Sequence, residues 1–237
     1  VIFVDEWGPI DPSEVRIIGP RPESTGAPNV YVRGPDAPST LFTATSLDPA
    51  FVVDPASGQA PATIRIRPTG SPPGRAFAPY AVRVKAGELE RTLRGTTWAL
   101  PWRVRFFAWT KDPREALDAY ARLVAGPATD EVTMPVLDGA WPGKPTPKVR
   151  ADRFATVAET KGLFDAGRYV LHVTSDDGVR VLVDGKVVLE DWTWHGPKDE
   201  DVVVELAAGE HALRVEHFEL DGYATLRLRM DPPTTPK

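Results

Sequence analysis

Two adjacent carboxylates, Asp176 and Asp177, precede a glycine in the segment TSDDGVRVLVDG. Carboxylate oxygens at a turn can bind a hard cation such as Ca²⁺, which takes about six to eight oxygen ligands. The same side chains can instead accept hydrogen bonds from backbone N–H groups and serve only to hold the turn. The sequence therefore makes this turn a candidate cation site, with a purely structural role as the alternative.

A second candidate lies in the segment EDWTWHG, where two tryptophans and a histidine occur close together. Alternation along an extended segment would put Trp192 and Trp194 on the same face. We expect Trp194 and His195 to lie at the surface, in the loop that follows the strand. An exposed aromatic ring suits the C–H face of a sugar, and a histidine can bind its hydroxyls. Trp194 and His195 are therefore candidate carbohydrate-binding residues.

The remaining ionisable side chains look structural. His172 and His211 lie within strand patterns, where an isolated histidine is more often a core or capping residue than a catalytic one. Glu216, His217 and Glu219 fall on one predicted strand, and no carboxylate pair is marked for glycoside hydrolysis. The H-E-x-x-H, G-x-S-x-G, G-x-G-x-x-G and P-loop motifs are absent. The sequence therefore predicts a protein that is not an enzyme.

Short strands separated by turn residues fill the first part of the chain. Candidate strands occupy residues 1–7, 15–18, 29–33, 40–45, 51–54, 63–67, 80–85 and 89–93. Several alternate apolar and polar residues, as half-buried strands do, and Gly- and Pro-rich turns separate them. Strands at such spacing are typical of a small β-sandwich. We predict an immunoglobulin-like or similar module over residues 1–95, with a break near Arg94-Gly95.

The second part of the chain holds the elements that must position both candidate sites. A strong strand at 101–109 precedes a helix predicted over 113–125, with Asp112 as its N-cap. A Pro-rich loop is predicted at 141–152, and alternating strands resume at 153. The VDGK segment at 183–186 predicts a two-residue hairpin, because Asp-Gly supplies the positive φ angles of a type I′ turn. The tail 233–237 is predicted to fray.

Composition limits the fold and the partners. The chain has 237 residues, of which 42% are hydrophobic, with a net charge of −5 and no cysteine. This length favours two domains, and the acidic balance argues against nucleic-acid binding. The absence of cysteine excludes disulfides and thiolate chemistry. No apolar run approaches the roughly 20 residues of a membrane helix, so membrane insertion is not expected.

The segments TSDDGVRVLVDGKVVLEDW (174–192) and AAGEHALRVEHFELDGYATLRLRM (207–230) resemble the PA14 domain family. That family reads as a strand, a DDG turn, a strand ending in a VDG-type hairpin, a Trp-bearing strand, and a strand of the pattern G-x-H-x-hydrophobic-R-hydrophobic-E-(Y/F). Gly209, His211, Arg214, Glu216 and Phe218 follow the last pattern. The resemblance covers about residues 98–232. It implies a mainly all-β fold, a β-sandwich or barrel with the short helix as an insertion. It also implies that Trp192, on the Trp-bearing strand, lies in the core.

The resemblance also implies a ligand set. In sugar-binding members of the family, the paired Asp residues are joined by a cis peptide and hold Ca²⁺, which itself contacts sugar hydroxyls. Those members add an Asn or Asp from a loop near the last hairpin. The matching loop here, 219–222, offers Asp221, whereas the single Asn of the chain is Asn29. The implied metal and carbohydrate site is therefore made of Asp176, Asp177 and Asp221.

These features predict a non-catalytic accessory module of a larger secreted or surface bacterial protein. It would bind a glycan or polysaccharide, with Ca²⁺ as the candidate cofactor and other domains of the same parent chain as neighbours. The chain begins at Val1 inside a strand-like run, which favours a piece of a longer protein. The alternative is a structural spacer or protein-interaction module that positions a separate catalytic or adhesive domain.

Overall fold

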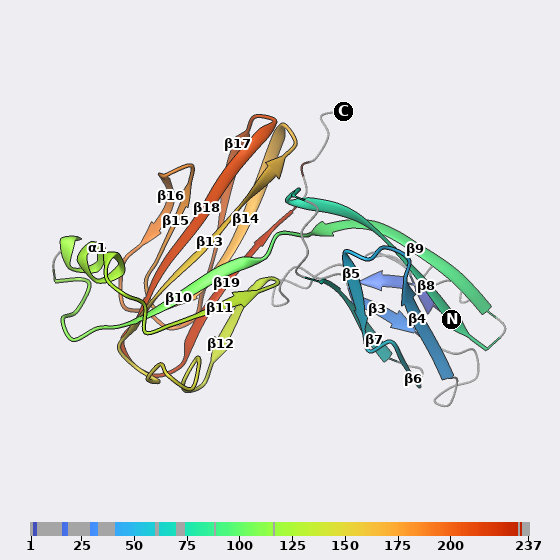
Figure 1. The fold of residues 1–237 in the computed structure, drawn as a ribbon, viewed down its shortest axis with the longest axis horizontal. Coiled ribbons are helices and arrows are strands. Elements are labelled where there is room, and N and C mark those ends of the chain that lie inside the picture. The colour runs from blue at the N-terminus through green and yellow to red at the C-terminus, as the bar shows by residue number, and fades with distance from the viewer. Residues whose placement is uncertain are drawn as a thin grey trace. The chain divides into compact units, whose positions relative to one another are not determined.

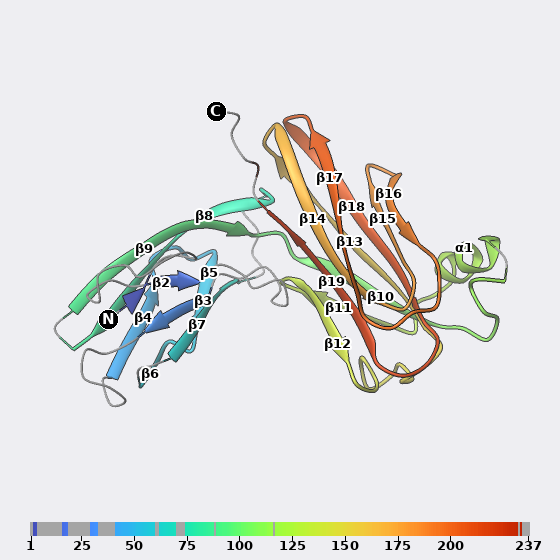
Figure 2. The ribbon, with the colours of Figure 1, turned by 180° about the vertical axis from the view of Figure 1, so that it is seen from behind.

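β-Strands dominate both halves of the computed structural model, in which one short helix is described (Figures 1 and 2). The structure describes residues 2–3, 16–18, 29–32, 41–59, 62–69, 74–87, 89–115, 117–231 and 233. Most of the predicted strand 1–7 and of the predicted tail 233–237 lie outside these residues. The chain divides into two compact units, Val1–Ala99 and Leu100–Lys237. The all-β fold class is confirmed.

The first unit consists of two antiparallel sheets. One contains β1 (Ile2–Phe3), β3 (Asn29–Val32), β7 (Ala62–Pro68) and β5 (Phe51–Asp54) in that order, with β2 (Arg16–Ile18) also paired to β3. The other has the order β6 (Ser57–Gln59), β4 (Leu41–Ser46), β8 (Phe77–Ala86) and β9 (Leu89–Trp98).

Alternation in the sequence builds the core of this unit. Phe42 and Ala44 of β4 are buried while their neighbours are exposed, and Val82 and Val84 of β8 repeat the pattern. Ile64 and Ile66 of β7 join them from the other sheet in one apolar cluster. The N-terminal module is therefore a small β-sandwich, as predicted, and its immunoglobulin-like character stays a prediction.

Strand β9 runs through the position where the sequence predicted a break. Arg94 pairs with Ala81 and Gly95 with Tyr80, inside a continuous β8–β9 ladder. A Cβ on Gly95 would lie 2.5 Å from the Tyr80 hydroxyl oxygen, so this glycine makes room for a ring and does not end the strand. The two compact units divide between Ala99 and Leu100.

The second unit is a two-layered antiparallel sandwich. Its six-stranded sheet has the order β11 (Asp130–Met134), β10 (Trp102–Ala108), β13 (Phe154–Phe164), β18 (Gly209–Glu219), β15 (Val179–Val183) and β16 (Lys186–Asp191). Its four-stranded sheet has the order β12 (Leu137–Trp141), β19 (Ala224–Met230), β14 (Gly167–Asp176) and β17 (Lys198–Leu206). Strands β11 and β12 were not predicted, and Trp141 lies in β12 although it was assigned to a loop.

Aromatic side chains fill the space between these sheets. Phe106 of β10 meets Trp141 of β12 edge-on, with ring centroids 5.6 Å apart, and Phe154 of β13 lies 6.0 Å from the same tryptophan. Edge-to-face pairs of this kind add stability beyond the area they bury. Phe107 points to the opposite side of the six-stranded sheet, as the alternation in WRVRFFAW predicts.

Helix α1 (Leu117–Ala125) packs on that opposite side. Tyr120 is buried beside Phe107, and its hydroxyl donates to the backbone oxygen of Thr156 at 2.8 Å. The helix begins later than the predicted start at residue 113. Asp112 caps the Arg114 N–H at 2.8 Å as expected, but its carbonyl accepts from Glu115, which closes a turn before the helix.

The predicted VDGK hairpin is confirmed. Asp184 and Gly185 have φ angles of 50° and 76°, which a type I′ turn requires. The Asp184 carboxylate accepts the Ala212 N–H at 2.9 Å and bonds His211 Nδ1 at 2.6 Å. The turn between β15 and β16 is therefore fastened to β18 by the Asp and His of the family pattern.

Candidate metal centre

Three strand ends converge on the DDG turn. Asp176 ends β14, Asp177 and Gly178 follow, and β15 begins at Val179. Because Val179 pairs with His217 in an antiparallel ladder, the end of β18 runs back alongside the turn. This register brings Glu219, the last residue of β18, next to Asp177. The peptide bond between Asp176 and Asp177 is cis, as the resemblance implied.

Asp176, Asp177 and Glu219 form an acidic cluster. A carboxylate oxygen from each lies within 4.8 Å of the others. All three residues are buried, with exposed fractions of 7%, 1% and 0%. Buried carboxylates are costly unless they are paired, protonated or bound to a cation. The cluster therefore needs protons or a cation to offset its charge.

Asp177 joins two loops that are far apart in the sequence. One carboxylate oxygen accepts the His195 N–H at 3.1 Å and the other accepts the Leu220 N–H at 2.8 Å. Both bonds favour the charged form, although burial raises the pKa of Asp177 overall. Asp177 therefore accepts hydrogen bonds from backbone N–H groups, which is the structural role named above as the alternative to cation binding. The N–H groups belong to two other loops and not to the DDG turn itself.

Glu219 has no such support. Neither of its carboxylate oxygens has a hydrogen-bond partner in the part of the chain that the structure describes. Burial first, and then the neighbouring Asp177 and Asp176 carboxylates, raise the pKa of Glu219 to about 9. The same two causes, burial and the Asp177 charge, raise the pKa of Asp176 to about 6. Without a cation, Glu219 is protonated at neutral pH, whereas Asp176 is mostly ionised.

A neutral histidine closes the site from the core side. His217 is fully buried, and burial lowers its pKa to about 4. Its Nε2 lies 2.9 Å from the backbone oxygen of Asp176. A neutral ring next to a carbonyl oxygen must donate from that nitrogen, so His217 fixes the backbone at Asp176 without adding charge.

The glycine of the DDG turn is required by packing. A Cβ on Gly178 would lie 2.2 Å from a ring carbon of Phe218. The Phe218 N–H in turn donates to the Gly178 carbonyl oxygen at 3.1 Å. The ring can lie against the turn only because residue 178 has no side chain, which explains why the motif ends in glycine.

The structure places the predicted ligand Asp221 outside this cluster. Asp221 is exposed on the loop after β18, and its negative charge contributes to the raised pKa values of Asp176 and Glu219. Glu219, which looked structural in the sequence, takes the third position. The sequence signal that could have identified Glu219 as buried is strand alternation. Leu213, Val215 and His217, at the alternate positions before it, are all buried.

The second candidate segment does not form one aromatic face. Trp194 is 59% exposed, as expected. Trp192 packs edge-on against Tyr120 and Phe218, with centroids 4.9 and 5.0 Å away, so it belongs to the core beneath α1. Residues 192–197 are irregular, so strand alternation does not apply to them.

The His195 side chain was expected at the surface but is only 16% exposed. Its Nδ1 bonds the Gly196 carbonyl oxygen at 2.7 Å, and its Nε2 lies 3.7 Å from an Asp191 oxygen. The backbone N–H of His195 donates to Asp177, while the His195 side chain contacts its own loop. His195 therefore supports the acidic cluster through its N–H group.

The donor set suits a hard cation. It consists of oxygen atoms alone, with three carboxylates on residues held by three strands. Both oxygens of Glu219 are without a hydrogen-bond partner among the described residues, and Ca²⁺ is bound by carboxylate and carbonyl oxygens. The residues present therefore fit calcium.

A family model described as the PA14 domain matches residues 119–237. This match extends over half of the chain and includes the DDG turn, the hairpin and β18. The chain belongs to the PA14 domain family. None of the curated proteins compared matches it.

Solved structures with a similar arrangement include other PA14 domains. The PA14 sugar-binding domain from an RTX adhesin is 19% identical, with a TM-score of 0.47, and the match covers 56% of this chain and 89% of that one. The PA14 domain of the antifreeze protein MpAFP is 12% identical, with a TM-score of 0.46 and coverage of 55% and 80%. The epithelial adhesin 9 A domain from Candida glabrata, in complex with Galβ1-3GlcNAc, is 11% identical, with a TM-score of 0.45 and coverage of 58% and 84%.

Proposed function

We propose that this chain is a non-catalytic module that binds carbohydrate through Ca²⁺ held by Asp176, Asp177 and Glu219. The observation that supports it best is Glu219, a fully buried glutamate with no partner for either oxygen and two carboxylates beside it. A bound cation would offset the repulsion between the ionised carboxylates of Asp176, Asp177 and Glu219. A purely structural turn has no use for a third carboxylate.

The three carboxylates would have different roles in this site. Asp176 and Glu219 would supply oxygen ligands, and Asp177 would do so while holding the loops at His195 and Leu220. Bound Ca²⁺ would offer its remaining coordination positions to sugar hydroxyls. Metal binding would also displace the proton that Glu219 retains at neutral pH.

Exposed aromatic rings flank the loops that Asp177 holds. Trp194 immediately precedes His195 and is 59% exposed, and Tyr223 lies three positions after Leu220 and is 44% exposed. Asp221, which follows Leu220 in the chain, is also exposed. These groups suit the apolar and hydroxylated faces of a sugar ring. Together with family membership, they support a glycan or polysaccharide as the partner of a secreted or cell-surface protein.

Thermal unfolding with millimolar Ca²⁺ or with EDTA tests the metal. At a free concentration about a hundredfold above Kd, binding to the folded state adds about 2.7 kcal/mol, so Tm should rise by several degrees. Glu219→Gln should lose most of this shift while folding normally in EDTA. The matched control is Glu210→Gln, because Glu210 lies on the same strand in an exposed pair with Lys161. An unchanged Tm in the unsubstituted chain would rule the metal out.

A glycan array with and without Ca²⁺ tests the ligand. Binding that appears with Ca²⁺, disappears in EDTA and is absent in Glu219→Gln supports the proposal. A chain that shifts its Tm with Ca²⁺ but binds no glycan would be a calcium-stabilised spacer, which is the alternative function. Turnover of an array sugar would contradict the non-catalytic assignment.

A further inference from the structure

A groove of about 580 Å³ lies beside helix α1 on the outer side of the six-stranded sheet, apart from the acidic cluster. Its helical wall is formed by Tyr120, Ala121, Val124 and Ala125. Its floor comes from β15, β16 and β18 and carries both charged and aliphatic side chains. All of its lining residues belong to the second unit.

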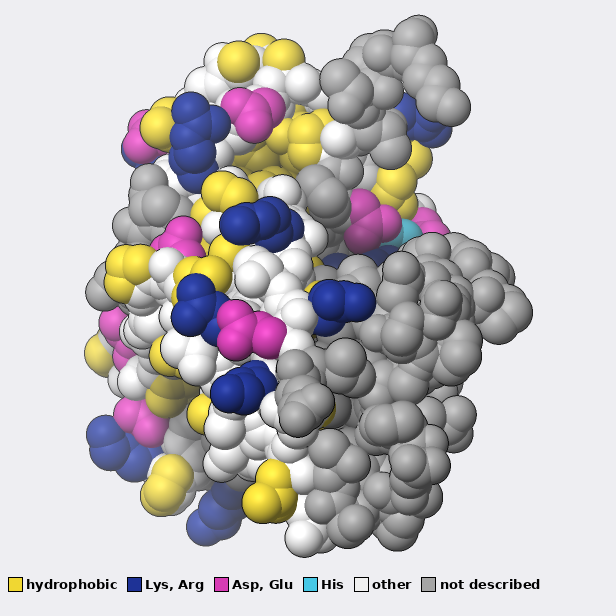
Figure 3. Space-filling model, turned by 90° about the vertical axis from the view of Figure 1, so that its right-hand side faces the viewer, with side chains coloured by type: hydrophobic (Ala, Val, Ile, Leu, Met, Phe, Trp, Pro, Cys, Tyr) yellow, Lys and Arg dark blue, Asp and Glu magenta, His cyan; other side chains and the backbone are white. Residues whose placement is uncertain are grey.

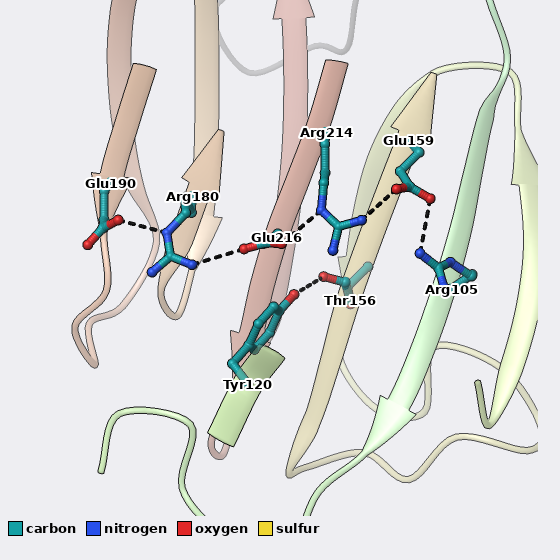
Figure 4. Close-up of polar contacts among 8 residues, drawn as sticks. All are labelled: Arg105, Tyr120, Thr156, Glu159, Arg180, Glu190, Arg214 and Glu216. Carbon is teal, nitrogen blue, oxygen red and sulfur yellow. Dashed lines mark hydrogen bonds and ion pairs between the residues drawn. The ribbon is translucent and has the colours of Figure 1, made fainter. Parts of the chain in front are cut away.

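A row of alternating charges crosses the sheet at this groove (Figure 4). It runs through Glu190, Arg180, Glu216, Arg214, Glu159 and Arg105, from β16 to β10, with nitrogen–oxygen distances of 2.5 to 3.0 Å between neighbours. Each guanidinium or carboxylate inside the row is shared by two opposite charges. The row is therefore neutral as a whole and fixed in place.

The two arginines of this row that line the groove, Arg180 and Arg214, each keep a hydrogen-bond donor free. Arg180 uses Nε and Nη1 for Glu190 and Glu216, and Arg214 uses the same two atoms for Glu216 and Glu159. The Nη2 group of each has no hydrogen-bond partner within the described ranges. Glu190 is 43% exposed at its side chain, so its carboxylate offers acceptor positions at the end of the row.

The charges around the groove favour a neutral ligand. Arg180 and Arg214 are balanced by Glu190 and Glu216, so an anion would meet carboxylates and a cation would meet guanidinium groups. A hydroxyl group can accept from a guanidinium and donate to a carboxylate. Fixed donors and acceptors side by side therefore match a ligand with several neighbouring hydroxyls.

The apolar part of the groove matches the other face of such a ligand. Val187 is 50% exposed and lines the floor with Leu182, and Ala121 and Val124 face them from the helix. Short aliphatic side chains leave room for the C–H groups of a sugar ring. We propose that this groove is a second carbohydrate subsite that needs no Ca²⁺. This inference rests on the proposed function for the class of ligand.

The test is a titration of the whole chain in EDTA, followed by amide NMR. The probes are β-lactose, maltose, cellobiose and methyl α-mannoside at millimolar concentrations. At least one should shift the amide signals of Ala121, Val187 and Arg214, and leave those of Asp177 and Trp194 in place. Ala121→Trp fills the groove from the helix and should weaken this binding at least tenfold. Arg122→Trp adds the same ring to an exposed position outside the groove and should not.

The outcomes separate the two sites. Binding in EDTA that survives Glu219→Gln and is lost in Ala121→Trp supports the subsite, even if no Ca²⁺-dependent binding is found. No shift with any of the four sugars in EDTA overturns it, even if Ca²⁺-dependent binding occurs. Equal weakening by both tryptophan variants also overturns it. Shifts of the same signals by sodium sulfate alone would make the groove an anion site instead.

Discussion

At the scale of single residues, two tryptophans close together in the sequence lie in opposite environments. Trp192 contacts Tyr120 and Phe218, and the Arg180 guanidinium lies 4.6 Å from its ring. Trp194, two positions later, is mostly exposed. Composition and spacing do not distinguish them, because the irregular loop between them removes the alternation on which a sequence argument depends. Trp192 is partly buried because its ring packs against Tyr120 of helix α1.

We expect this difference to appear as a separation of stability from binding. Trp192→Ala should lower the free energy of unfolding by about 3 kcal/mol, because it removes packed aromatic contacts. Trp194→Ala should change it by less than about 0.5 kcal/mol, as exposed substitutions usually do, and weaken glycan binding at least tenfold. Chemical denaturation and the glycan array measure the two effects. Retained binding in Trp194→Ala would remove this ring from the site.

The glycine of the DDG turn gives a second expectation at this scale. Gly178→Ala should cost about 1–3 kcal/mol and reduce the Ca²⁺-induced Tm shift, because the new methyl group must displace the Phe218 ring. Gly143→Ala is the control, since a Cβ there meets nothing within 4 Å. Adding Phe218→Leu to Gly178→Ala should recover part of the lost Ca²⁺ response. A fully normal Gly178→Ala would contradict the packing explanation.

At the scale of elements, turns and strands could be predicted from the sequence where a few adjacent residues determine the backbone conformation. The Asp184-Gly185 turn and the strand FVVD at 51–54 occur as predicted. Strands β11 and β12 were missed because each has only five residues and is followed directly by a proline. The third carboxylate was missed for a related reason. Glu219 is brought to Asp177 by the β15–β18 register, and pairing between distant strands is not written in any local pattern.

The β15–β16 hairpin should show a pH-dependent contribution to stability. The Ala212 N–H and then His211 lower the pKa of Asp184, and the Asp184 carboxylate raises the pKa of His211. The Asp184 contribution is complete above about pH 4 and lost as the pH falls through its lowered pKa. The His211 contribution is complete below about pH 6.5 and lost as the pH rises through its raised pKa.

Asp184→Asn tests this linkage, because Asn tolerates positive φ and keeps an acceptor for Ala212. We expect it to cost about 1 kcal/mol or less between about pH 4 and 6.5, since Asp184 is partly exposed. The cost should shrink as the pH rises above that window. Denaturation curves at several pH values give the measurement, and His211→Gln should show no such change on the alkaline side. A cost independent of pH would leave only the neutral hydrogen bonds.

At the scale of the whole molecule, the candidate functions fall in one unit. The acidic cluster, the charge row and the groove all lie within Leu100–Lys237. No helix among the described residues is long and apolar enough to cross a membrane. On the face drawn in Figure 3, basic and acidic side chains are interspersed in the described part, and neither sign forms a continuous patch there.

We therefore expect a chain starting at Leu100 to fold by itself and to keep its Ca²⁺ response. Its Tm shift between Ca²⁺ and EDTA should match that of the full chain within about 2 °C, because every contact to the acidic cluster described here lies within this unit. Differential scanning calorimetry provides the comparison. Loss of the shift in a folded fragment would show that the first unit contributes to the site.

The Asp177 carboxylate links the loop at His195 to the loop at Leu220, and each loop carries an exposed aromatic residue close by. A ligand that meets these loops finds them already held at a fixed separation, so little conformational entropy is lost when they close on it. The side chains at the loop tips are free to vary while the N–H groups beneath them keep their positions. If the proposed sugar site is correct, substitutions at Trp194 or Tyr223 would change which sugar is bound and leave the backbone contacts of Asp177 intact.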